Sequence, residues 1–270
     1  MDLDLRKLRY FAAVAEHRHF GRAAEQLYIA QPVLSRQVRA LEQELGCELL
    51  VRTTRSVQLT PAGEQLYEDA RSVFASVDAA VRRVHEADRG VERLVVAFVP
   101  GLHVSEAVRA FTAKYPDVEI KLLHLMWWEQ DAPLRDGRAD VGYLRRPFDD
   151  TGLRTIPIGR EPRVACLPTT HRLAGRAELV MADLADESIL DAQARRTASV
   201  EEKLELIAAG HGIGLIPRSV AVSYFRADLV YIPVTDAGMA ETCIAVAENR
   251  QGGRIRDFTE FAAHILPADE

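Results

Sequence analysis

The first 45 residues contain three short stretches in which apolar side chains recur at helical spacing. In the first, the apolar positions follow i, i+3, i+4 and i+7, as on one face of a helix: Leu8, Phe11, Ala12 and Ala15. The second repeats this spacing with Phe20, Ala23, Ala24 and Leu27. The third contains Leu34, Val38, Leu41 and Leu45 and stops at Gly46, a residue type that often ends helices. Helices this short must pack on one another to bury their apolar faces.

The second and third stretches are joined by a very short connection. Tyr28, Ile29 and Ala30 separate them, and Pro32 stands in the first turn of the third stretch, where its missing N–H costs nothing. Two helices joined by three or four residues are typical of a helix-turn-helix.

The segment after Gly46 predicts two short strands with a basic tip. Leu49, Leu50 and Val51 are apolar, and Val57 and Leu59 are apolar again before Thr60 and Pro61. Between them lies the polar run Arg52, Thr53, Thr54 and Arg55. A two-stranded hairpin after a helix-turn-helix predicts a winged helix-turn-helix.

From Pro61 to Gly90 the pattern indicates one long helix. Its apolar residues alternate spacings of four and three: Leu66, Ala70, Val73, Val77, Ala80 and Val84. This spacing is typical of the contact seam between two paired helices. Fewer than three heptads are present, so an amphipathic helix packed on its own domain is the alternative.

Beyond Gly90, short apolar runs alternate with helical stretches, which favours an α/β domain with a parallel sheet. We expect strands over 94–99, 118–123, 141–144, 164–167, 213–216, 229–234 and 242–247. We expect helices over 104–111, 200–209 and 255–266.

Length and composition fit a chain of two domains. The 270 residues exceed the usual size of one core, and 48% hydrophobic with 27% charged residues is ordinary for globular proteins. No apolar run approaches the roughly 20 residues that a membrane span needs, and the N-terminus lacks the apolar stretch of a secretory signal. We therefore expect a cytoplasmic protein with no membrane partner.

Charge gives weak support for nucleic-acid binding. Residues 1–63 hold nine Lys or Arg and seven Asp or Glu, a net charge of +2, while residues 64–90 hold four and six, a net charge of −2. The whole chain carries −6, so residues 91–270 also carry −6. Nucleic-acid binding normally draws on clustered basic residues, so the prediction rests on sequence pattern.

Several motifs resemble one family. FGRAAEQL, QPVLSRQVRALEQELG and LTPAG in the first 63 residues resemble the DNA-binding module of LysR-type transcriptional regulators. LPTTHRLAG, DLADESI and AAGHGIGLIPRSVA resemble landmarks of the family's effector domain. The chain departs from the family at Ala30, where a serine is usual, and between Leu190 and Val200, where it is shorter.

The resemblance implies an α/β protein with an N-terminal winged helix-turn-helix (1–60), a linker and dimerisation helix (61–90) and a periplasmic-binding-protein-like effector domain (91–270). The effector domain would comprise subdomain I (91–160 and 238–270) and subdomain II (161–237), joined by crossovers near 159–162 and 235–238. It further implies a sequence-specific regulator that binds double-stranded promoter DNA, responds to a small-molecule effector, and assembles as homodimers and homotetramers.

The third helix is the expected recognition helix. Base edges are read from near the start of such a helix, and Gln31, Pro32, Ser35, Arg36 and Arg39 lie there on the polar side. Gln pairs with adenine and Arg with guanine, so we assign base contacts to Gln31 and Arg36 and phosphate contacts to Ser35 and Arg39. Arg52, Thr53, Thr54 and Arg55 of the wing would contact the DNA backbone or minor groove. The alternative is an ordinary solvated face.

Three places are candidates for effector binding. The turn after the first strand holds Pro100, Gly101 and Leu102, and Thr197 precedes an S-x-x-E capping box of Ser199 and Glu202. Trp127 and Trp128, with Tyr143, Arg145 and Arg146, would suit an anionic or aromatic effector. Capping for Ser199, core packing for the tryptophans and solvation for the arginines are the alternatives.

Other functions find little support. The eight histidines show no metal-ligand spacing, and GHGIG lacks the full dinucleotide-binding spacing, so we expect no metal, no cofactor and no enzyme. A ligand-independent DNA-binding regulator remains a second candidate. Cys47, Cys166 and Cys243 form no CxxC pair, which favours buried thiols, although a redox pair of Cys166 and Cys243 is an alternative.

Overall fold

The computed structural model describes residues 3–52, 57–190, 199–250 and 252–265. The chain divides into two compact units, residues 1–81 and residues 82–270. Each unit is described by itself.

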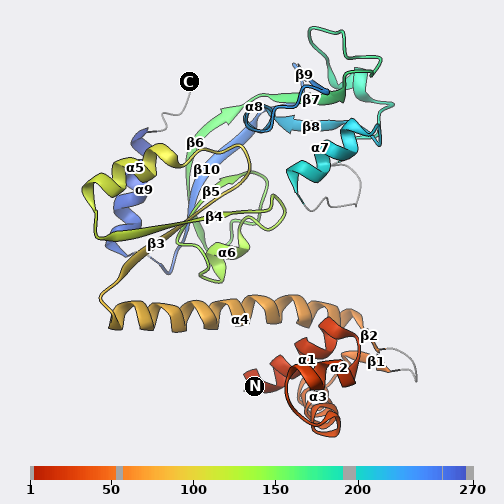
Figure 1. The fold of residues 1–270 in the computed structure, drawn as a ribbon, viewed down its shortest axis with the longest axis vertical. Helices are drawn as coiled ribbons and strands as arrows, with labels where there is room; N and C mark the ends of the chain where they lie inside the picture. Colours follow the sequence, from red (N-terminus) through yellow and green to blue (C-terminus); the bar gives the residue numbers. More distant parts are fainter. Residues whose placement is uncertain (1–2, 53–56, 191–198, 251, 266–270) are drawn as a thin grey trace. The chain divides into compact units, whose positions relative to one another are not determined.

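The first unit is a winged helix-turn-helix followed by a long helix (Figure 1). Its elements are α1 (Leu5–His17), α2 (Phe20–Gln26), α3 (Gln31–Leu45), β1 (Leu50–Arg52), β2 (Val57–Leu59) and α4 (Pro61–Asp88), which continues into the second unit. β1 and β2 form an antiparallel pair in which Leu50 faces Leu59. Each predicted helix and both wing strands are present.

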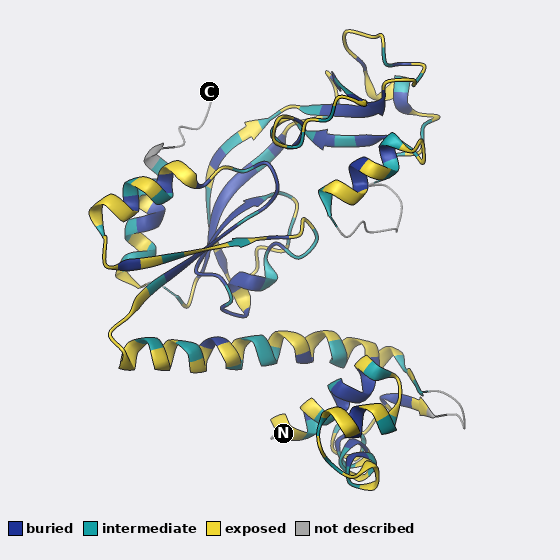
Figure 2. Ribbon diagram, viewed as in Figure 1, coloured by how far each residue is buried: buried dark blue, intermediate teal, exposed yellow. Residues whose placement is uncertain are grey.

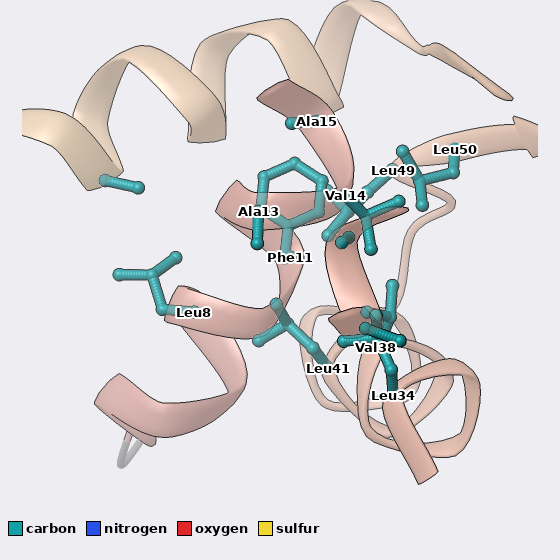
Figure 3. Packing of buried hydrophobic residues seen from close by; sticks show 13 residues of the cluster. Leu8, Phe11, Ala13, Val14, Ala15, Leu34, Val38, Leu41, Leu49 and Leu50 are labelled. Carbon is teal, nitrogen blue, oxygen red and sulfur yellow. The ribbon is translucent and has the colours of Figure 1, made fainter. Parts of the chain in front are cut away.

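One apolar core holds this unit together (Figure 3). Phe11 and Val14 of α1 and Leu34, Val38 and Leu41 of α3 are completely buried. Ala70 of α4 is buried in the same cluster, and Leu66 and Val73 pack against it. Burying large aliphatic and aromatic side chains gains about 1.5–3 kcal/mol each, so this cluster fixes the orientation of α3.

The ends of the short helices are set by local residues. The carboxylate of Asp4 accepts a hydrogen bond from the Arg6 N–H at the start of α1. Nδ1 of His19 accepts from the N–H groups of Gly21 (3.1 Å) and Arg22 (3.3 Å) at the start of α2. α3 begins after Ala30, whose side chain offers no cap, and ends at Gly46, with φ of 70° in the left-handed region that glycine favours.

Polar contacts join the wing to the helices. The Glu42 carboxylate of α3 accepts hydrogen bonds from the N–H groups of Leu49 (3.1 Å) and Leu50 (3.2 Å). The Thr60 hydroxyl donates to the Glu48 carbonyl and accepts from the Gly63 N–H. A Cβ at Gly63 would lie 2.0 Å from the Leu49 carbonyl oxygen, so the LTPAG motif needs glycine here for a close backbone contact.

The second unit begins with a five-stranded mixed sheet, called here the larger sheet. It consists of β3 (Glu92–Phe98), β4 (Val118–His124), β5 (Val141–Arg145), β6 (Leu153–Glu161) and β10 (Ala240–Ala247), in the order β4-β3-β5-β10-β6. β3 is parallel to β4 and β5, whereas β10 is antiparallel to β5 and β6. The predicted parallel arrangement is therefore confirmed for the first three strands.

Helices cover the two faces of the larger sheet. α5 (Ser105–Lys114) and α9 (Gly253–Ile265) contribute Phe111 and Phe258 to the core on one face. α6 (Ala132–Arg135) contributes Leu134 to the core on the other. Figure 2 shows the central strands buried between these layers.

A three-stranded antiparallel sheet, called here the smaller sheet, completes the unit. β7 (Arg163–Pro168) lies between β8 (Gly214–Pro217) and β9 (Leu229–Pro233). A 3₁₀ helix (Met181–Leu184), α7 (Val200–Ala208) and α8 (Arg218–Ser223) accompany it. Pro162 lies between β6 and β7, and residues 234–239 lie between β9 and β10, at the predicted crossovers.

The structure adds four elements that the sequence pattern did not predict: β6, α6, the 3₁₀ helix and α8. α6 and the 3₁₀ helix have four residues each, too few to show a helical period. β6 was not expected because its sequence LRTIPIGRE has no continuous apolar run, and only Leu153 and Ile158 are buried. α8 is too short to show a clear helical period. No helix among the described residues is both long and apolar enough to cross a membrane.

Candidate nucleic-acid interface and effector site

The two sides of α3 differ sharply in exposure. Leu34, Val38 and Leu41 are completely buried. Gln31, Pro32, Arg36 and Arg39 are exposed and Ser35 is half-buried, so the structure brings all five predicted residues to one accessible surface. We call this surface the α3 polar face. Its amide, hydroxyl and guanidinium groups can donate hydrogen bonds to bases and phosphates.

The α3 polar face adjoins a hollow beside the wing. The hollow has a volume of about 480 Å³ and is lined by Arg39, Glu42, Glu48, Leu50 and Val51. Arg39 is the basic residue of this lining, and the Glu42 carboxylate beside it accepts hydrogen bonds from the Leu49 and Leu50 N–H groups. Arg39 therefore lies nearer the wing than Arg36 does.

The predicted wing tip is described only in part. Arg52 is the last residue of β1. Thr53, Thr54 and Arg55 lie outside the described residues. The role predicted for these residues stays a prediction.

In the second unit, Arg145 is the centre of a hydrogen-bond network. Its Nε and Nη2 donate to Oε1 of Glu161 at 3.1 and 2.8 Å. Nη2 also donates to the Ser219 hydroxyl at 2.9 Å, and Nη1 donates to the Pro100 carbonyl at 3.1 Å. The network thus joins the end of β5, the end of β6, the turn after β3 and the start of α8.

Burial makes this ion pair electrostatically strong. The side chains of Arg145 and Glu161 are 12% and 16% exposed. Burial lowers the pKa of Arg145, and the charge and hydrogen bond of Glu161 oppose that shift. Removing one partner of such a pair would leave a charge without compensation in a poorly hydrated place.

The predicted turn after β3 lies against α8. Pro100 and Gly101 are buried and Leu102 is half-buried. Gly101 has φ of +84°, and a Cβ there would lie 2.7 Å from both the Ser219 hydroxyl oxygen and the Val220 nitrogen. The structure therefore brings Pro100, Gly101 and Arg145 together where the turn after β3 and the end of β5 contact α8.

The predicted aromatic residues lie in different surroundings. Tyr143 is completely buried in the core under α5 and α9, and burial raises its pKa. Its hydroxyl has no hydrogen-bond partner among the described residues. Trp127 is 42% exposed and packs edge-on against the half-buried Trp128, with ring centroids 5.5 Å apart. Arg146 pairs with Asp150 at 2.9 Å, away from the network.

Ser199 caps α7. Its hydroxyl accepts a hydrogen bond from the Glu202 N–H at 3.1 Å, which is the capping role considered from the sequence. Thr197 lies outside the described residues.

Sequence reasoning missed three residues of the network. Gln130 holds the backbone of Arg145 from both sides: its Oε1 accepts from the Arg145 N–H at 2.9 Å, and its Nε2 donates to the Arg145 carbonyl at 2.7 Å. Glu161 and Ser219 bind the guanidinium. Ser219 lies within the motif AAGHGIGLIPRSVA. The motif therefore drew attention to this segment but did not indicate that Ser219 binds Arg145.

Cys166 and Cys243 are buried thiols. Burial raises the pKa of Cys166 in β7 to about 12 and that of Cys243 in β10 to about 11. A redox-sensing thiol needs the opposite shift, so the alternative of a redox pair gains no support. Within the described ranges, no three His, Cys, Asp or Glu side chains form a group that could hold a metal ion.

Both units match one family. Residues 5–64 match "Bacterial regulatory helix-turn-helix protein, lysR family", and residues 85–196 match "LysR substrate binding domain". The HTH-type transcriptional regulator BudR of Raoultella terrigena is 32% identical over 92% of this chain and 95% of BudR. The uncharacterized HTH-type transcriptional regulator YnfL of Escherichia coli K12 is 42% identical over 69% of this chain, and this match spans 65% of YnfL.

A solved structure has the same fold. The crystal structure of CbnR, a LysR family transcriptional regulator, aligns with a TM-score of 0.67 over 99% of this chain and 100% of that chain, at 24% identity. A winged helix-turn-helix, a long helix and a two-sheet ligand-binding domain define a DNA-binding transcriptional regulator with an effector domain. The chain belongs to the LysR family.

Proposed function

We propose that this chain controls transcription by binding promoter DNA through the α3 polar face and the wing. The effector domain then adjusts this binding when a small molecule enters at Arg145. The observation that carries the proposal is the division of α3 into a completely buried apolar side and an accessible side with two arginines and a glutamine. Because its target is chromosomal DNA, we assign the protein to the cytoplasm, and we infer that it acts by binding and not as an enzyme.

The proposed domain division follows the sequence landmarks. We assign DNA binding to residues 1–60, dimerisation to residues 61–90 and effector binding to residues 91–270, with subdomain I (91–160 and 238–270) around the larger sheet and subdomain II (161–237) around the smaller one. In the first unit, the early part of α4 packs on the winged helix-turn-helix core.

The later part of α4 supports dimerisation. Val84 of the apolar seam is 66% exposed and Val81, next to the seam, is 51% exposed, whereas Ala70 of the seam is buried in the first unit. A second copy of α4 would cover these valines. Two recognition helices would then contact half-sites about 34 Å apart or a multiple of that distance, and pairs of dimers would form tetramers.

Within the α3 polar face, Gln31 and Arg36 would read bases, and Pro32, Ser35 and Arg39 would lie near the backbone. Arg52, Thr53, Thr54 and Arg55 of the wing would reach phosphate or the minor groove. A bidentate base contact is worth about 1–3 kcal/mol, or roughly tenfold to hundredfold in affinity.

The experiment is a gel-shift and footprint measurement on the promoter of the chain's own gene. Arg36→Ala should weaken binding by about tenfold or more and leave the melting curve unchanged. Arg71→Ala removes the same charge from an exposed position on α4 and should leave affinity within about twofold. Equal affinities for the Arg36 variant and the wild type would refute the assignment.

We place the effector at the contact between the subdomains. Pro100, Gly101 and Arg145 meet there, and the buried guanidinium favours an anionic effector. Leu102, Trp127, Thr197 and Ser199 stay candidates from the sequence, whereas the complete burial of Tyr143 in the core removes it from the set. A thermal-shift screen of carboxylate metabolites on the full chain, followed by footprinting with the metabolites that bind, tests this placement. The double variant Arg145→Met, Glu161→Gln leaves no unpaired buried charge and should abolish any response that the wild type shows.

A regulator that needs no ligand is the second candidate. The observation favouring it is that the network around Arg145 is already complete within the chain. A footprint that no metabolite in the screen alters would support this candidate.

A further inference from the structure

Both carboxylate oxygens of Glu161 are bound by donors from other segments. Oε1 accepts from Nε and Nη2 of Arg145 at 3.1 and 2.8 Å and from the Ser219 hydroxyl at 3.0 Å. Oε2 accepts from the Ser219 N–H at 2.7 Å. Glu161 therefore occupies a position in which a guanidinium, a hydroxyl and a backbone N–H all converge on one carboxylate.

One donor residue belongs to the larger sheet and the other lies beside the smaller sheet. Arg145 ends β5 of the larger sheet, and Ser219 lies in α8 beside the smaller sheet. Glu161 is the last residue of β6, immediately before Pro162 and the crossover to β7. The same donors can bind the carboxylate of a small molecule, because charge-assisted hydrogen bonds form with a side-chain carboxylate and with a free one alike.

We propose that Glu161 is a built-in ligand that occupies the anion position of the effector site, and that a carboxylate-bearing effector binds by displacing it. This inference rests on the proposed placement of the effector at Arg145. Exchange of one carboxylate for another keeps the buried guanidinium paired throughout, whereas a neutral ligand would leave it uncompensated. The site should therefore select carboxylates over the corresponding amides.

The released side chain can turn toward solvent. Glu161 is 16% exposed, and its neighbour Arg160 already extends outward, 68% exposed, in an ion pair with Glu241. Displacement breaks the contact between β6 and α8 that Glu161 makes through Ser219. Effector binding would thus remove the hydrogen bonds that join the crossover after β6 to α8, beside the smaller sheet.

The test is chemical rescue in the full-length protein. Glu161→Ala removes the built-in carboxylate and leaves its donors in place. Sodium acetate, compared with sodium chloride at equal ionic strength, should raise the Tm of this variant by about 2 °C or more beyond its effect on the wild type. Glu241→Ala removes an exposed carboxylate from the neighbouring strand and should respond like the wild type. The double variant Arg145→Met, Glu161→Ala should lose the extra shift.

A second measurement covers the case in which Glu161→Ala does not fold. Glu161→Gln keeps the size of the side chain, and calorimetry should show benzoate binding at least about tenfold tighter than to the wild type. Benzamide should bind neither protein. Equal acetate shifts in all variants, or benzoate affinities within about threefold, would overturn the inference.

The two proposals fail in different ways. A metabolite that alters the promoter footprint through Arg145, together with no acetate rescue of Glu161→Ala, would overturn displacement and leave the proposed effector site intact. Acetate rescue together with a footprint that no metabolite changes would support the anion position and contradict its effector role.

Discussion

Gly101 lies so close to Ser219 that a Cβ on the glycine would come within 2.7 Å of the serine hydroxyl oxygen. The turn after β3 and the start of α8 are therefore in contact through backbone and hydroxyl atoms, next to the Arg145 network. A side chain at Gly101 would have to push these two segments apart.

Gly101→Ala should lower the stability of the effector domain by about 2–4 kcal/mol, from overpacking of about 1–3 kcal/mol and an unfavourable positive φ of about 1 kcal/mol. Gly152→Ala is the matched control, because Gly152 has φ of +71° and a Cβ there would meet no described atom within 4 Å. Urea unfolding followed by tryptophan fluorescence measures the difference. If both variants lost the same free energy of unfolding, the close approach of Gly101 to Ser219 would not contribute to the cost of the substitution.

His19 should be needed as the cap of α2. His19→Ala removes the acceptor for the Gly21 and Arg22 N–H groups and should cost about 1 kcal/mol, whereas His19→Asp should retain the stability. Hydrogen–deuterium exchange of the α2 amides localises the effect. Protection of α2 in the alanine variant equal to that in the wild type would count against the cap.

Ala30→Ser should supply the cap that α3 lacks. Its hydroxyl would accept from a first-turn N–H and raise the stability of the first unit by about 0.5–1 kcal/mol. Ser72→Ala is the control: it removes a hydroxyl from an exposed position inside α4, away from the apolar seam, and should be slightly stabilising. Thermal unfolding of the two variants compares them, and a loss of stability in Ala30→Ser would contradict the prediction.

Tyr143→Phe should stabilise the effector domain by about 1 kcal/mol, because the tyrosine hydroxyl is buried without a partner. Tyr115→Phe is the contrast: it deletes a hydrogen bond of 2.8 Å to Asp257 and should destabilise the fold. Urea unfolding at neutral pH compares the two. A destabilised Tyr143 variant would indicate that its hydroxyl is satisfied in solution.

The same variant should reduce alkaline sensitivity. Burial raises the pKa of Tyr143 above its ordinary value of 10.0, so the folded state retains the proton after the unfolded chain has lost it. Below about pH 10 the tyrosine keeps its proton in both states and its ionisation does not change stability; as the pH rises further, ionisation in the unfolded chain favours unfolding. Between pH 8 and pH 10.5, the free energy of unfolding should decrease less for Tyr143→Phe than for the wild type.

The helices of the first unit were predictable because each has a strong local signal. The spacing of Leu34, Val38 and Leu41 defined the buried side of α3, and Gly46 marked its end. The exposed position of Arg36 followed from the same period. β6 was not predictable, because its partner β10 lies about 90 residues away and its own apolar residues are scattered.

Only part of the candidate effector site was predictable from the sequence. Arg145 was found because it follows a buried strand, but its partners Glu161 and Ser219 are 16 and 74 residues away. In the sequence, Glu161 stands between Arg160 and Pro162 and looks like an ordinary surface charge. Tyr143 was expected beside a ligand, and the structure buries it because β5 lies in the middle of the larger sheet.

The placement of the three cysteines has a practical consequence for handling the protein. Cys166 and Cys243 are buried, whereas Cys47, two residues after the end of α3, is exposed. Air oxidation, alkylating reagents and thiol-reactive dyes will therefore attack beside the wing first. A fluorophore attached to Cys47 would therefore report on DNA contact while leaving the effector domain unlabelled.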